Sequence, residues 1–269
     1  MTLPGVARAP MQAITPIAAR TVTVSVVSHL HGEQIMQLLC KLEALCHLHV
    51  GHVVVTINVP EPALVARIQS RPWAFELTLL QNPLPKGFGA NHNAAFGHNK
   101  LDYFGVLNPD IDFEADPFTD LIAKLADPLA GCSFPIQLDM AGQLQDHARN
   151  TPSPAALLER YKLFGAAPQP QRPSKPDWVN GAFMLFRAGL FKQLGGFDQR
   201  YFMYCEDVDI CFRLQLAGYA LSRSEAKVTH AASRSSRGNV THLAWHVLSL
   251  LRLWTSASYR NFSRFKQKQ

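Results

Sequence analysis

The chain has 269 residues, 47% of them hydrophobic, and a formal net charge of +6. This length and apolar content are enough for one large α/β domain or two small ones, and they exclude a largely disordered chain. No apolar run approaches the ~18 residues of a membrane-spanning helix, and the first twenty residues, expected to form a flexible leader, lack the apolar core of a signal peptide.

The positive charge is concentrated in the last part of the chain. From Ala220 to the end there are nine Lys or Arg residues and one acid, Glu225. Such a surface attracts phosphates, whether in anionic lipid, a pyrophosphate-linked substrate or nucleic acid. No recognised nucleic-acid motif occurs, so we expect no nucleic-acid partner. The five cysteines form no CxxC pair and lie mostly in apolar surroundings, which favours reduced core cysteines in a cytoplasmic protein.

The first part of the chain predicts strand, helix and strand, over residues 22–27, 33–46 and 52–59. This order indicates a right-handed parallel crossover, and ligands of such sheets bind beyond the carboxyl ends of the strands. Ser28, His29 and Asn58 are therefore expected near a site.

A glycine-rich segment, residues 81–99, follows a short helix at 64–69 and a third strand at 75–80. Gly87 and Gly89 permit close approach of the backbone, and Asn91 and Asn93 add polar groups at a helix start. Such a turn can hold a phosphate through backbone N–H groups. It is neither a P-loop nor a GxGxxG motif, and a plain turn with a helix cap is the alternative.

A fourth predicted strand, 103–107, runs directly into Asn108-Pro109-Asp110. A carboxylate in that place suits a hard cation, since Mg2+ takes one or two carboxylates and completes its shell with water and phosphate. The alternative is a β-turn capped by an aspartate.

The middle of the chain predicts a helix, a strand, a second helix and a further strand, over residues 118–125, 132–138, 155–164 and 179–186. The proline-rich segment 139–177 is long enough to serve as a substrate lid. In the last of these strands, small residues at Asn180-Gly181-Ala182 would let a ligand approach.

Two adjacent carboxylates, Glu206 and Asp207, follow an aromatic run and open a helix that ends at Gly218. The helix dipole stabilises acids in a first turn as anions. An ionised carboxylate at the edge of an apolar pocket is what a general base requires. The alternative is that both are only favourable first-turn residues.

A last strand is expected to begin at 220–222 and to end at His230. Histidine is a common metal ligand, although a lone histidine is often structural. Arg234 and Arg237, which follow it, suit phosphate.

The final predicted element is an apolar helical stripe over 239–259, with a basic tail behind it. We expect it to attach to an anionic membrane face, so that deletion of 255–269 would release the protein. An ordinary helix that packs on the core is the alternative.

Taken in order, these motifs resemble the family 2 glycosyltransferases of GT-A fold, and most closely the bacterial rhamnosyltransferase-type enzymes of O-antigen and capsule assembly. Four stretches carry the resemblance: VSVVSH at 24–29, NPLPKGFGANHNAAF at 82–96, LNPDI at 107–111, and WVNGAF through EDVDICFRLQLAGY at 178–219. It extends to His230 and to WHVLSLLR at 245–252.

The resemblance implies a mixed, mainly parallel α/β sheet flanked by helices. The domain would cover 21–235, and a C-terminal basic amphipathic helix and tail would cover 236–269. It implies an inverting transferase that moves a sugar, with L-rhamnose from dTDP-rhamnose as one candidate, from a nucleotide-sugar donor. The acceptor would be a lipid-linked oligosaccharide or a polysaccharide at the inner face of the cytoplasmic membrane.

The resemblance also implies the roles of individual residues. Asp207 would be the base, with support from Glu206, while Asp110 and His230 would hold Mg2+ or Mn2+. The residues on the donor side would be Ser28, His29, Asn58, Gly87, Gly89, Asn91, Asn93, Asn108, Asp110, Gly181, Arg234 and Arg237.

Two departures from the family pattern affect these roles. Asn108 stands where the family has the first Asp of DxD. The second strand ends in TINVPE, without the usual base-binding Asp, which suggests a different nucleotide or an Asn58 that reads thymine or uracil through its amide. These departures keep open a catalytically silent GT-A-like module that binds glycan or membrane in an assembly complex.

Overall fold

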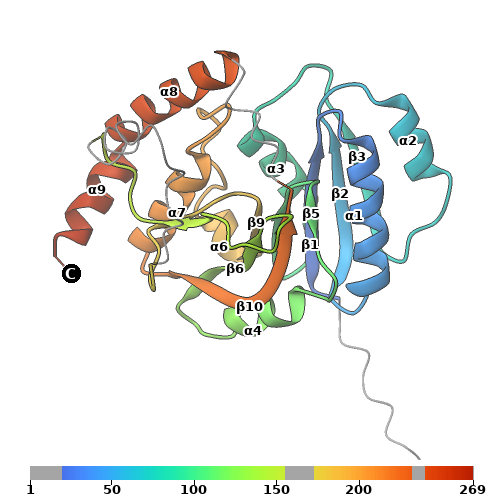
Figure 1. The fold of residues 1–269 in the computed structure, drawn as a ribbon, viewed down its shortest axis with the longest axis horizontal. Helices are drawn as coiled ribbons and strands as arrows, with labels where there is room; N and C mark the ends of the chain where they lie inside the picture. The colour runs from blue at the N-terminus through green and yellow to red at the C-terminus, as the bar shows by residue number, and fades with distance from the viewer. Residues whose placement is uncertain (1–19, 155–172, 232–239, 269) are drawn as a thin grey trace, which may run out of the picture.

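The computed structural model describes residues 20–154, 173–231 and 240–268. The helix predicted at 155–164, nearly all of the leader, and Arg234 and Arg237 lie outside the described residues. Within the described part, eight strands form one sheet in the order β3-β2-β1-β4-β9-β6-β10-β5, and β7 pairs with β8 in a second, small sheet (Figure 1).

The strands of the large sheet are β1 (Val22–Ser28), β2 (Val50–Ile57), β3 (Glu76–Gln81), β4 (Tyr103–Leu107), β5 (Ile111–Asp112), β6 (Ala130–Leu138), β9 (Phe183–Arg187) and β10 (Ala220–His230). The small sheet consists of β7 (Ala148–Arg149) and β8 (Trp178–Val179). The helices are α1 (Gly32–Leu45), α2 (Pro62–Gln69), α3 (Phe88–Phe96), α4 (Phe118–Leu125), α6 (Ala188–Gln193), α7 (Glu206–Leu216), α8 (Val240–Thr255) and α9 (Ala257–Lys266).

The large sheet is mixed and mostly parallel, which confirms the expected fold class. Strands β3, β2, β1 and β4 run parallel, as do β6 and β10. Strand β9 runs antiparallel between β4 and β6, and β5 runs antiparallel beside β10. The start of β9 therefore lies at the carboxyl ends of its neighbours.

The two faces of the sheet have separate apolar cores, because side chains alternate along each strand. In β2, Val53 and Val55 belong to one cluster with residues of α1, α2 and α4, whereas Val54 belongs to the other. That second cluster is rich in aromatic side chains and includes residues of α6, α7, α8 and α9. Figure 1 shows α1 and α2 beside β1–β3 at one end of the molecule and α7, α8 and α9 gathered at the other.

Of the last two predicted strands, one is divided in the structure and the other is confirmed. The strand expected over 179–186 is divided into β8 and β9, because Asn180, Gly181 and Ala182 bond to groups outside the sheet ladder. The last strand, expected to begin at 220–222 and to end at His230, is β10 with these bounds. Its register against β6 shifts between Arg223 and Lys227, and this bulge holds the polar residues that interrupt the apolar pattern.

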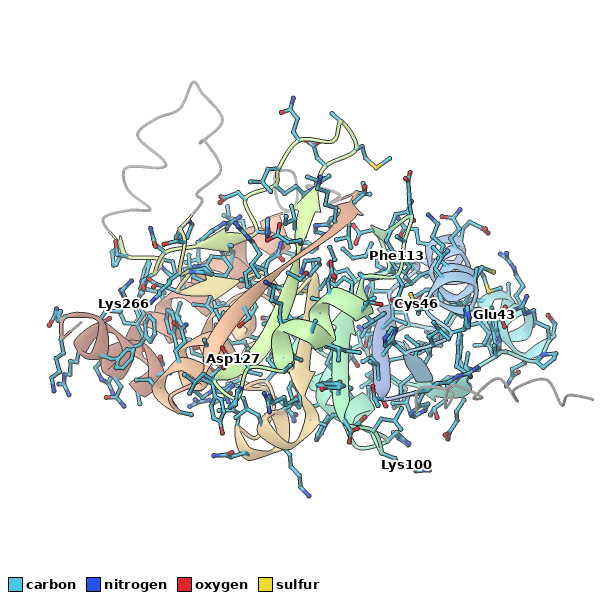
Figure 2. All side chains as sticks on the ribbon, turned by 90° about the horizontal axis from the view of Figure 1, so that it is seen from below. Glu43, Cys46, Lys100, Phe113, Asp127 and Lys266 are labelled. Carbon is cyan, nitrogen blue, oxygen red and sulfur yellow. The ribbon has the colours of Figure 1, made fainter. Side chains whose placement is uncertain are left out.

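The C-terminal segment forms two helices where one was expected. Ser256 caps α9, since its side chain accepts a hydrogen bond from the N–H of Tyr259. Phe262 is 1% exposed and stacks on Phe212 of α7, with 4.2 Å between the ring centroids. Lys266, at one end of the molecule in Figure 2, pairs with the buried Asp177 at 2.6 Å.

Helix α9 is therefore part of the core, and the expectation of a basic tail after a single helix was wrong. Deletion of 255–269 would open the aromatic cluster of α7, so it cannot report on membrane contact alone. No helix in the described residues has both the length and the hydropathy to cross a membrane.

Candidate active site at the carboxyl edge of the sheet

The candidate site begins where β1, β2 and β4 end, at the same edge of the sheet. Because these strands are parallel, Ser28, Asn58 and Asn108 follow one another along this edge. The N–H of Asn108 donates to the carbonyl of Ala182 at 2.8 Å, so the segment before β9 also lies here.

Asp110 and His230 meet at this edge although 120 residues separate them in the chain. Ile111 is opposite His230 in the β5–β10 ladder, and the N–H of Ala231 donates to the carbonyl of Asp110. Asp110 Oδ1 lies 3.4 Å from His230 Nε2. Burial raises the pKa of Asp110, but the hydrogen bond and charge of His230, a backbone hydrogen bond and the charge of His31 together leave that pKa below its ordinary value.

Gln145 fixes the orientation of His230. Gln145 Nε2 donates to the backbone carbonyl of His230 at 2.6 Å, which leaves Oε1 to accept from His230 Nδ1 at 3.0 Å. With Nδ1 as a donor to Gln145, Nε2 faces Asp110 in either of two ways: a protonated ring donates from Nε2 to the carboxylate, whereas a neutral ring presents a lone pair that could bind a metal ion. No pattern in the sequence pointed to Gln145, which lies in the polar segment before β7.

A divalent cation fits between these two side chains. Two ligands of one ion at bond lengths of ~2.1 Å lie ~3 Å apart at a right angle, close to the separation of Asp110 Oδ1 and His230 Nε2. Among the described residues, no group of three or more His, Cys, Asp or Glu side chains could hold a metal. An ion here would need water and phosphate oxygens for its remaining positions, as Mg2+ commonly does.

The second pair of acids, Glu206 and Asp207, begins α7. Tyr204 and Cys205 before them both have left-handed backbone conformations, with φ of 71° and 67°. Such conformations are costly for residues other than glycine and often occur at functional sites. They turn the chain sharply into α7 and present Asp207 to the carboxyl edge.

Asp207 is half-buried, and backbone N–H groups hold both of its oxygens. Oδ2 accepts from Gly181 at 3.2 Å and Oδ1 accepts from Val208 at 2.8 Å. Burial raises the pKa of Asp207, although these donors and the positive charge of Arg149 oppose the shift. The result is a carboxylate whose basicity is greater than that of an ordinary aspartate.

Glu206 has a different environment. It is 5% exposed, and its Oε2 has no hydrogen-bond partner among the described residues. Burial raises its pKa well above the ordinary value, and the charge of Asp207 adds to the shift. Glu206 therefore remains neutral while Asp207 ionises, which keeps one negative charge in the pair.

Short links through residues 181 and 182 join the two parts of the site. Asp207 bonds to the N–H of Gly181, and the next residue, Ala182, accepts from Asn108, two positions before Asp110. The two acids that the sequence singled out thus lie at one edge of the sheet. Asn180 and Gln137 exchange two hydrogen bonds of 2.8 and 2.9 Å beside this link, a pair that sequence reasoning missed.

Asn58, which follows β2, links several loops at this edge of the sheet. Its Oδ1 accepts from Asn82 Nδ2 and from the N–H of Lys86, and its Nδ2 donates to the carbonyl of Lys86 and lies 3.1 Å from His29 Nδ1. With its amide engaged in this way, Asn58 could read a base only if these bonds were exchanged. Asn91, 1% exposed, bonds to Asn82 and Lys86 and so belongs to the same network.

The glycine-rich turn has a structural explanation. A Cβ on Gly87 would lie 2.3 Å from the carbonyl oxygen of Phe202, and one on Gly89 would lie 2.7 Å from the side chain of Phe197. The amide of Asn93 bonds to both the N–H and the carbonyl of Phe197. These residues thus bind the turn to the segment before α7, and their contact with a donor stays a prediction.

Glu61 is a further residue that sequence reasoning missed. Its Oε1 accepts from Ser28 Oγ at 2.5 Å and from the N–H of Leu30 at 3.0 Å. Leu30 has a φ of 65°, so Glu61 holds the loop after β1 in a conformation that a leucine rarely adopts. The acid in TINVPE was visible in the sequence, but its partner 33 residues earlier was not.

The comparisons with known proteins bear on the family and the fold of the chain. No family model matches the chain. It is 33% identical over 197 residues to the rhamnosyltransferase WbbL of Escherichia coli K12, which covers 66% of this chain and 75% of that protein. It is 34% identical over 167 residues to the N-acetylglucosaminyl-diphospho-decaprenol L-rhamnosyltransferase of Mycobacterium tuberculosis H37Rv, which covers 54% of this chain and 52% of that protein.

Solved glycosyltransferase structures share the fold. The mannosyltransferase PcManGT from Pyrobaculum calidifontis, in complex with GDP-Man and Mn2+, matches with a TM-score of 0.60 and 18% identity over 91% of this chain and 68% of that one. At this identity the likeness shows the GT-A fold alone. The chain also spans about half the length of the mycobacterial relative, which is 52% covered.

Proposed function

This chain belongs to the rhamnosyltransferase-like glycosyltransferases of GT-A fold, and from that premise we propose that it transfers L-rhamnose from dTDP-rhamnose to a hydroxyl group of a lipid-linked glycan. The reaction would take place at the inner face of the cytoplasmic membrane, in the synthesis of a cell-surface polysaccharide. The proposed sugar and acceptor are suggested by the two similar rhamnosyltransferases, one of which acts on a decaprenol-linked sugar.

One observation carries the proposal: Asp207, a half-buried carboxylate whose pKa burial raises, lies at the same sheet edge as the Asp110–His230 pair. A glycosyl transfer needs these two functions side by side. One must remove a proton from the incoming alcohol, and the other must stabilise the departing diphosphate.

The proposed reaction is a single displacement with inversion at the anomeric carbon. Asp207 accepts the proton of the acceptor hydroxyl, whose oxygen forms a bond to the anomeric carbon. The bond from that carbon to the diphosphate oxygen breaks, and the nucleoside diphosphate leaves with the electron pair. Because Glu206 stays protonated, the single negative charge of the pair lies on Asp207.

Asp110 and His230 would hold Mg2+ or Mn2+, which when bound neutralises charge on the diphosphate. Asn108, in place of a second acid, lies 3.5 Å from His230 Nε2 and offers an amide instead of a charge. The site therefore relies on one carboxylate, and its affinity for a metal without nucleotide should be modest.

The proposal is tested by transfer from a panel of nucleotide sugars to a polyprenyl-diphosphate acceptor, with Mn2+ and with EDTA. We expect turnover with dTDP-rhamnose that depends on the metal. Calorimetry with dTDP, UDP and GDP in the presence of Mn2+ measures nucleotide binding directly and can contradict the proposal. If none of them binds, the chain is the silent GT-A-like module and the proposed reaction is wrong.

A further inference from the structure

The outer face of α8 exposes aliphatic side chains that no described residue covers. Leu243, Val247, Leu248 and Leu251 are 51%, 48%, 63% and 52% exposed. They follow helical spacing, while Leu253 on the opposite side is fully buried. A row of four large apolar side chains on one helix face is more than the scattered exposure that is normal for a surface.

The segment that carries this face has charge of one sign, although Lys266 pairs with Asp177 and Arg200 of the neighbouring groove pairs with Asp198. From residue 240 to the end there is no acid, and the basic residues are Arg252, Arg260, Arg264, Lys266 and Lys268. A groove beside the apolar row is lined by Arg200, Phe202, Trp245, Leu248 and Arg252. Aliphatic side chains on a helix with basic residues around them match the interface of an anionic bilayer, where apolar groups enter the lipid and cations meet phosphates.

The inner side of the same helix holds the segment that leads into the catalytic acids. Ser249 Oγ donates to the carbonyl of Met203 at 2.8 Å, and Tyr204 OH lies 2.9 Å from His242 Nδ1. Phe202 packs on Trp245 with 4.9 Å between the ring centroids. A partner that binds the outer face of α8 would therefore be separated from the turn before Asp207 only by this helix.

We propose that the outer face of α8, defined by Leu243, Val247, Leu248 and Leu251, docks on the surface of an anionic lipid bilayer, with the helix in the plane of the membrane. The choice of a lipid surface rests on the proposed function, because an acceptor with a lipid anchor would be presented there. Docking through α8 brings the Asp207 side of the site to that acceptor while the protein stays peripheral. Figure 1 shows α8 at the periphery of the molecule, with α9 below it at the same end.

The test is co-sedimentation with vesicles of phosphatidylcholine that contain about 30% phosphatidylglycerol, compared with pure phosphatidylcholine. The test variant is Leu248→Ser/Leu251→Ser. The control is Leu129→Ser/Leu48→Ser, because these leucines are equally exposed, at 63% and 52%, and precede β6 and β2 at the opposite edge of the sheet.

We expect the wild type and the control to bind the anionic vesicles, and the test variant to bind at least about tenfold more weakly, which corresponds to about 1.4 kcal/mol. Added salt should weaken wild-type binding. The proposal is overturned if the wild type does not bind, or if both variants bind as the wild type does. It is also overturned if light scattering shows a wild-type dimer that the test variant abolishes, since the face would then join two copies.

The vesicle experiment contains no donor, so its result does not depend on turnover. Nucleotide binding in the absence of vesicles reports separately on the proposed function. A protein that binds vesicles but no nucleotide would refute the proposed reaction and leave the docking surface in place.

Discussion

Replacement of Asp207 by asparagine tests the centre of the proposed mechanism. The substitution keeps the size of the side chain and removes its ability to accept a proton at neutral pH. General-base catalysis typically contributes about 10²–10⁴-fold in rate, so kcat should fall by that factor, or roughly 3–5 kcal/mol in the activation free energy.

The structure allows the effect on folding to be estimated separately. Both oxygens of Asp207 accept backbone N–H groups, from Gly181 and from Val208. Asparagine has one acceptor oxygen and can keep only one of these bonds, which should lower the free energy of unfolding by about 1 kcal/mol. Such a loss leaves the protein folded, so the fall in kcat is not a folding effect.

The pH dependence gives a second readout. Because burial raises the pKa of Asp207, the base is ionised only above the ordinary range of an aspartate. Wild-type kcat/KM should therefore rise with pH as Asp207 ionises, at a pH above the ordinary range of an aspartate. The residual kcat/KM of the variant should not show this rise.

The assay is release of nucleoside diphosphate over a pH series, with calorimetry of the donor as a binding measurement. Asp198→Asn is the control, since Asp198 lies in the loop before α7 and pairs with Arg200 at the surface. A variant at position 207 that retained wild-type kcat and the same acidic limb would show that the base is elsewhere.

Three further predictions concern the metal, the core and the neutral acid. Asp110→Asn should weaken Mn2+-dependent binding of the nucleotide at least tenfold by calorimetry, whereas Asp112→Asn, two residues away and 58% exposed, should not; equal loss in both would refute the metal role. Phe262→Ala should lower the free energy of unfolding by about 3–5 kcal/mol in urea, and a change below ~1 kcal/mol would mean that α9 is only a solvated tail. The pKa of Glu206 in the folded state lies above its ordinary value of 4.5. The stability that the protonated Glu206 contributes is therefore fully present below pH 4.5, and it is lost as the pH rises through the pKa of the folded state. The wild type should thus melt progressively lower than Glu206→Gln as the pH increases, and a constant difference in Tm from pH 4 to 9 would contradict the neutral state.

Much of the site could be predicted from local sequence. The aromatic run before Glu206 and Asp207 indicated carboxylates at an apolar edge, and the proline before Asp110 indicated an acid at the end of a strand. Both are properties of a few consecutive residues, so the sequence alone carries them.

The partners of these residues could not be predicted in the same way. Gln145 orients His230 from 85 residues away, and Glu61 holds the loop of Ser28 across 33 residues. Such pairs depend on the register of β5 against β10 and on the relative position of strand ends. Short-range patterns do not specify either of these.

Local sequence was enough to predict which segments are apolar, where most strands end, and that the C-terminal stripe is helical. It did not predict which side of each segment is covered: α9, basic in composition, is held in the core by Phe262, while Leu243, Leu248 and Leu251 of α8 remain exposed. The physical reason is that hydrophobic periodicity defines an apolar face but does not say whether another element packs on it. That depends on the space left between α7 and its neighbours once the chain has folded.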